Sequence, residues 1–126
     1  MRTKGEIEAA ISEEIRHFEQ DFVGRNPKGI QVHLIDDLLL IRLRGVLAAA
    51  EHQLVKLLPA EKGRDLLKQV WSQLIETNRP VMEAMVEKVT GIKILTIHLD
   101  ISTITGEEVI LFTLARSPDF REAKME

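Results

Sequence analysis

The chain has no cysteine among its 126 residues. This absence excludes disulfides, thiolate catalysis, iron–sulfur clusters and zinc sites built on cysteine. It also fits a reducing compartment, so we expect a cytoplasmic protein.

A basic excess is missing as well, because 17 Lys and Arg stand against 20 Asp and Glu, for a net charge of −3. Binding to nucleic acid through bulk electrostatics depends on such an excess, so we expect no nucleic-acid partner. The few aromatic residues, four Phe and one Trp, fall at core positions of predicted helices and strands and form no stacking platform for bases.

Long apolar segments are also absent. The longest aliphatic run, Leu38–Ile41, is far shorter than the roughly 20 residues of a membrane-spanning helix. The N-terminal sequence MRTKGE leads into an acidic amphipathic stretch, which is not the pattern of a signal peptide. The sequence therefore predicts a protein without a membrane span.

The composition that remains, 44% hydrophobic and 29% charged, is ordinary for a globular protein. The length suits a single domain over residues 1–126. We expect its core to extend over about residues 4–116 and the polar tail, 117–126, to be frayed.

The first part of the chain predicts a helix followed by a hairpin. Apolar residues recur every three or four positions over Glu6–Phe22, and Gly24 is suited to end this helix. Two alternating segments follow, over residues 29–35 and 38–44. Asp36–Asp37 between them predicts a tight turn.

The middle of the chain predicts two further helices. Residues 46–58 form a short Ala-rich helical pattern, and residues 61–64 look like an exposed corner. The longest helix is expected over residues 65–90, with a kink or a break at Pro80. Its predicted buried stripe consists of Leu67, Val70, Trp71, Leu74, Val81, Met85 and Val89.

The most regular pattern in the sequence is a second hairpin over residues 91–115. Its first strand alternates an apolar face, Leu95, Ile97, Leu99 and Ile101, with a polar one, Thr96, His98 and Asp100. The return strand, Val109–Ala115, is apolar on both faces and therefore needs cover on both.

The order α-β-β-α-β-β predicts an α+β fold with a four-stranded, largely antiparallel sheet and helices packed on one face. We expect the other face to carry the apolar residues Ile35, Leu38, Leu40, Ile110, Phe112 and Leu114 beside His33, Arg42, Arg44, Thr96, His98 and Asp100. A half-apolar face of this size predicts a homodimer. The alternative is that the kinked long helix folds over it.

Two pairs of residues on that face could catalyse a reaction or bind a ligand. His98 and Asp100 are neighbours on one strand and could act as an acid–base pair, or form a structural polar cluster at an interface. Arg42 and Arg44 could bind a carboxylate, phosphate or bicarbonate, or simply pair with acidic residues.

The second hairpin tip crowds hydroxyl and acidic side chains, including Ser102, Thr103 and Glu107. These residue types close turns, and a surface-loop binding role is the alternative. We therefore predict a ligand-binding polar cluster made of Arg42, Arg44, His98, Asp100, Ser102, Thr103 and Glu107. We predict no catalytic residue and no cofactor. We also predict no metal site, because His17 and His52 lack converging ligands.

Several segments together resemble a known bacterial family. They are Gly24–Lys28, Arg42–Leu47 with Ala50–Glu51, Arg79–Pro80, His98–Thr103, Thr105–Glu107 and Val109–Leu114. In this order the chain resembles, from Lys4 to about Arg116, component C (MpsC-like) of a sodium-translocating, membrane-potential-generating system. It departs at Asn26, where a second glycine is usual, and at Ala48–Ala49, where Thr-Pro is common; both are turn or helix-start positions.

The resemblance implies a small cytoplasmic accessory of a membrane system that handles cations or inorganic carbon, with a membrane-protein partner and no established catalytic residues. The first hypothesis is thus a non-enzymatic binding or regulatory domain of unknown ligand. The second is a small enzyme that uses His98 and Asp100, and nucleic-acid binding ranks last.

Overall fold

The computed structural model describes residues 2–24, 26–46, 51, 56, 60–102 and 104–120. Its elements are α1 (Lys4–Phe18), the π-helix η1 (Glu19–Val23), β1 (Gly29–Ile35), β2 (Leu38–Arg44), α3 (Ala60–Thr90), β3 (Ile94–Ile101) and β4 (Glu108–Leu114). The α+β class and the order of the elements are confirmed. The predicted helix over residues 46–58 lies almost entirely outside the described residues.

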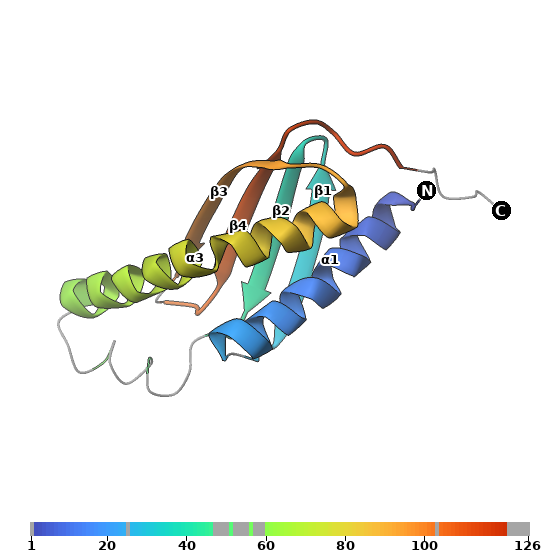
Figure 1. Cartoon of the computed structure of the whole chain (residues 1–126). Helices are drawn as coiled ribbons and strands as arrows, with labels where there is room; N and C mark the ends of the chain where they lie inside the picture. The colour runs from blue at the N-terminus through green and yellow to red at the C-terminus, as the bar shows by residue number, and fades with distance from the viewer. Residues whose placement is uncertain are drawn as a thin grey trace.

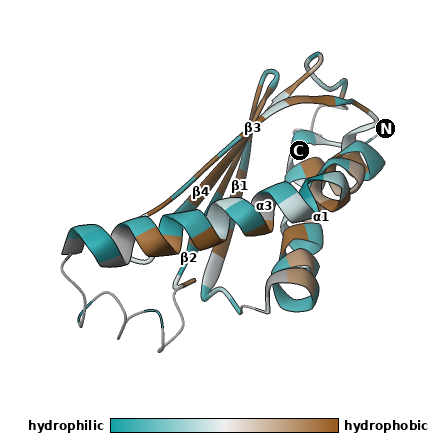
Figure 2. Cartoon of the chain, turned by 60° about the vertical axis from the view of Figure 1, so that its left-hand side comes forward, coloured by the Kyte–Doolittle hydropathy of each residue, from teal (hydrophilic) through white to brown (hydrophobic). Residues whose placement is uncertain are grey.

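The four strands form one antiparallel sheet in the order β1-β2-β4-β3. Helices α1 and α3 lie on the same side of this sheet, with α1 against β1 and α3 against β3 (Figure 1). The turned view in Figure 2 shows the same two layers edge-on. The described helices therefore cover one face of the sheet only.

Helix α1 begins at a capping box and ends in a π turn. The Thr3 hydroxyl accepts a hydrogen bond from the Glu6 backbone, and the Glu6 carboxylate accepts one from Thr3 in return. The wider π turn shifts the helical stripe, so Glu19 is buried and Phe22 is 51% exposed. The prediction that the apolar stripe continues to Phe22 was therefore wrong.

The first hairpin matches its prediction, and its outer edge is protected. Asp36 adopts a positive φ of 53° in the tight turn between β1 and β2. On the open edge of β1, the Leu34 backbone amide donates a 2.8 Å hydrogen bond to the Glu8 carboxylate of α1. This contact occupies a donor that an edge strand would otherwise offer to another strand.

Helix α3 is longer and more regular than the sequence predicts. Residues 61–64 belong to its first turns, so the predicted corner was wrong. Pro80 lies inside the helix and does not split it. The lost backbone hydrogen bond is offset because apolar residues on both sides of Pro80, Trp71 before it and Met82 after it, are buried in one core.

The buried stripe of α3 differs from the predicted one at Val70. Leu67, Trp71 and Met85 are buried as expected, whereas Val70 is 48% exposed. The N-terminal half of α3 extends past the sheet edge (Figure 1), so only one side of it meets the core.

The strands of the second hairpin pack differently from their predicted faces. A register shift between Ile94 and Thr96 leaves Leu95 exposed, although alternation placed it in the core. On β4, Ile110 and Phe112 pair with Ile41 and Leu39, which lie under the helices. The assignment of Ile110, Phe112 and Leu114 to the open face was therefore wrong; they are fully buried core residues.

Candidate binding face

The sheet face that no described helix covers, called the open face below, carries an ordered array of side chains. Strand register aligns His33, Leu40, Leu111 and His98 in one row across all four strands. A second row consists of Gln31, Arg42, Val109 and Asp100, and a third of Ile35, Leu38, Thr113 and Thr96.

Along the strands the open face changes from charged to apolar. Arg42 and Arg44 lie toward the end of β2, and Glu107 precedes β4 at the same end. At the opposite end, Leu38 and Ile35 flank the turn between β1 and β2. This face is therefore amphipathic along the strand direction, with a charged end and an apolar end.

The charged end is organised by one ion pair. The Arg42 guanidinium donates a 2.9 Å hydrogen bond to the Glu107 carboxylate. That bond, together with the positive charges of Arg42 and Arg44, lowers the pKa of Glu107 below its ordinary 4.5. The same bond and the negative charge of Glu107 raise the pKa of Arg42. The Arg42 Nε is buried without a hydrogen-bond partner among the described residues, so the guanidinium is only partly satisfied.

Glu107→Gln is expected to lower the free energy of unfolding at neutral pH and to matter less as the pH falls. A carboxylate whose pKa is depressed by folding stabilises the folded state above its ordinary pKa of 4.5. That contribution disappears as the pH falls through the lower, folded-state pKa. Urea titrations of both proteins from neutral pH to about pH 3 measure the change. Arg42→Gln should reduce the pH dependence of the free energy of unfolding in the same way. A difference in the free energy of unfolding between wild type and Glu107→Gln that stays constant with pH would contradict the Arg42–Glu107 ion pair as its source.

The predicted pair His98 and Asp100 lies on the open face at the edge strand β3. Both side chains are exposed, and no hydrogen bond joins them in the described part of the chain. The Asp100 carboxylate instead lies 3.0 Å from the Lys68 ammonium, which reaches it from α3. Sequence reasoning missed Lys68, because no local pattern connects a helix residue to a strand 32 positions later.

The tip between β3 and β4 is a closed turn. The Ser102 hydroxyl accepts hydrogen bonds from the backbones of Ile104 and Thr105, and the Thr105 hydroxyl accepts one from Glu107. The structural reading of these hydroxyls thus accounts for their positions. The predicted site residue Thr103 lies outside the described residues. Ile104, at the tip, is 92% exposed.

Among the described residues, no three His, Asp or Glu side chains come together as metal ligands do.

Two carboxylates that the sequence reasoning passed over, Glu19 and Glu108, are buried. Burial of Glu108 was not detectable from the sequence, because alternation places it on one face with Ile110 and Phe112 but does not say which face of β4 is the core. Burial of Glu19 was not detectable either, since the π turn that buries it leaves no trace in the helical period.

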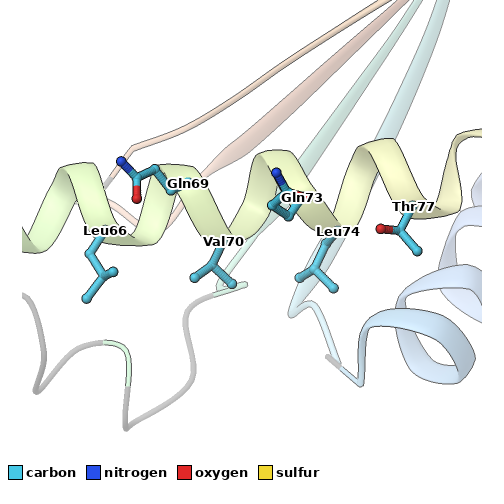
Figure 3. Close-up of a pocket in the computed structure, with 6 residues that line it drawn as sticks. All are labelled: Leu66, Gln69, Val70, Gln73, Leu74 and Thr77. Carbon is cyan, nitrogen blue, oxygen red and sulfur yellow. The ribbon is translucent and has the colours of Figure 1, made fainter.

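A second apolar surface lies on α3. Half-exposed Leu66 and Val70, with Leu74, point to the same side of the helix (Figure 3). Gln69, Gln73 and Thr77 complete a shallow groove of about 440 Å³. No charged side chain is among these lining residues.

Fold and face together define a class: a small α+β domain whose described helices lie on one face of the sheet, while the other face carries ordered polar and apolar rows. Residues 3–116 match the family described as "Na+-translocating membrane potential-generating system (MpsC)". The chain belongs to this MpsC family.

A curated relative supports the assignment. The chain is 32% identical over 113 residues to the uncharacterized protein YbcI of Bacillus subtilis (strain 168), which covers 90% of this chain and 89% of the relative. No solved structure matches the chain. None of the helices in the described part combines the length and apolar content that crossing a bilayer requires.

Proposed function

We propose that this domain is a non-enzymatic binding and regulatory unit that self-associates through its open face and serves a membrane system. The observation that carries the proposal is the open face itself. Leu38, Leu40, Val109 and Leu111 lie side by side on its two central strands, β2 and β4, where no described helix covers them. Contiguous apolar surface rimmed by polar groups is typical of protein interfaces.

A second copy of this chain is the proposed occupant because the face is balanced in charge. Arg42 and Arg44 bring two positive charges, and Glu107 and Asp100 bring two negative ones. Two identical faces therefore meet without net repulsion, and the apolar centre supplies the driving force.

The proposed partner beyond the dimer is a membrane protein, which the family description supports by naming a sodium-translocating system. The proposed contact region is the charged end of the open face and the adjoining tip: Arg42, Arg44, His98, Asp100, Ser102, Thr103 and Glu107. Of these, Asp100 on the edge strand β3 and Ser102 in the adjoining tip lie at the rim of the face, where a partner can approach an assembled dimer. The proposed location is the cytoplasm, which a chain without cysteine suits.

The experiment that tests self-association is multi-angle light scattering on the purified chain over a concentration series. The expected result is a mass twice that of one chain at micromolar concentration, with dissociation on dilution. A single-chain mass at every concentration up to the solubility limit would refute the dimer.

A further inference from the structure

We infer that two copies pair about a two-fold axis that runs along their strands, which places β2 of one copy over β4 of the other. This inference rests on the proposed self-association and adds the orientation of the copies and the residues that meet. It follows from the distribution of charged and apolar side chains over the open face.

Two identical sheet faces can be related by an axis along the strands or by an axis across them. An axis across the strands lays the charged end of one copy on the apolar end of the other. Arg42 and Arg44 would then lose water against the apolar side chains of Leu38 and Ile35, which is costly, and the nearby carboxylates of Asp36 and Asp37 lie in the exposed turn beyond these rows. An axis along the strands lays like end on like end and avoids this cost.

With the axis along the strands, opposite charges meet between the copies. Within one chain, Glu107 is paired with Arg42, and Arg44 has no ion pair among the described residues. Arg44 lies on β2, so it stands over β4 of the second copy, near that copy's Glu107. Two-fold symmetry repeats the contact, and each dimer gains two intermolecular Arg44–Glu107 pairs.

The same orientation matches the middle of the face. Leu40 lies opposite Leu111 of the second copy, so the apolar side chains along β2 of each copy are buried against those along β4 of the other. At the edges, His33 of β1 lies over His98 of the second copy's β3. Within one chain these two histidines stand at opposite edges of the sheet, about 14 Å apart from three strand spacings.

Because the chain has no cysteine, engineered thiols report on this orientation without background. His33→Cys and His98→Cys replace exposed side chains, and the two single variants are mixed with a short bis-maleimide. The expected result is a crosslinked dimer in the mixture and none in either variant alone. Crosslinking of His33→Cys by itself would show β1 over β1, which is the axis across the strands, and would overturn the inference.

A charge exchange tests the Arg44–Glu107 contact separately. Arg44→Glu alone and Glu107→Arg alone each place like charges opposite one another in the dimer and are expected to weaken it about tenfold. In the equimolar mixture, a dimer with one copy of each variant has opposite charges at both 44–107 contacts. Mixed dimers should therefore form about as tightly as the wild-type dimer. Sedimentation velocity measures all three samples, and circular dichroism checks that each variant is folded.

The outcomes separate this inference from the proposed function. A wild-type chain that stays monomeric removes the self-association itself. A wild-type dimer with no crosslink in the mixture, or no recovery on charge exchange, keeps the self-association and overturns the orientation.

Discussion

Leu40→Arg is expected to turn the dimer into monomers. Leu40 lies at the centre of the open face, beside Leu111, and is half-buried in the single chain. In the dimer an arginine there would be desolvated among apolar side chains without a partner. A central interface residue of this kind costs about 2–4 kcal/mol, or roughly 30- to 1,000-fold in Kd. Analytical ultracentrifugation of the variant and the wild type measures the change.

Leu66→Arg is the matched control for this variant. It makes the same substitution at a half-exposed leucine on α3, in the layer away from the open face. We expect it to leave the dimer intact. If Leu66→Arg dissociates the dimer while Leu40→Arg does not, the interface is the α3 groove and the open face is not used.

Phe112→Ala is expected to have the largest effect on stability. Phe112 is fully buried in the centre of the core face of β4, between its partners Leu39 and Ile97. Truncating a buried phenylalanine removes its transfer free energy and leaves a cavity, at a cost of about 3–5 kcal/mol. Because a domain is only marginally stable, this loss consumes much of its free energy of unfolding. Urea denaturation at low protein concentration measures it.

Phe120→Ala provides the comparison, since it removes the same side chain from a position that is 41% exposed. We expect a change within about 1 kcal/mol, as for other surface substitutions. Equal losses at the two positions would mean that Phe112 does not face the core. The register of β4 would then have to be reassigned.

Much of the fold follows from local patterns. Gly24 and Gly91 adopt positive φ at the ends of their helices, as their position after an apolar period predicts. Asp36–Asp37 closes the first hairpin, and both hairpins pair as expected. These features depend on neighbours within a few residues, so a single sequence determines them.

The candidate site was predictable only in part. Arg42 and Arg44 fall on the open face as alternation requires, but Arg42 pairs with Glu107, 65 positions later. Asp100 lies on the same face of β3 as His98, as predicted, but its carboxylate forms an ion pair with Lys68 of α3. The Arg42–Glu107 contact depends on the register of β2 and β4, and the Lys68–Asp100 contact depends on where α3 crosses the sheet edge. No local spacing in the sequence records either.

By itself the sequence determined the element order, the turns and the classes of chemistry that a chain without cysteine or a basic excess lacks. Only the tertiary structure decided which side of β4 is the core. That strand is apolar on both faces, so alternation separates its residues into two faces but does not indicate which face is buried in the core. Its pairing with β2 and β3 puts Phe112 under the helices and Leu111 on the open face. Paired residues on neighbouring strands point to the same side of a sheet, so Phe112 follows Leu39 into the core and Leu111 follows Leu40 to the open face.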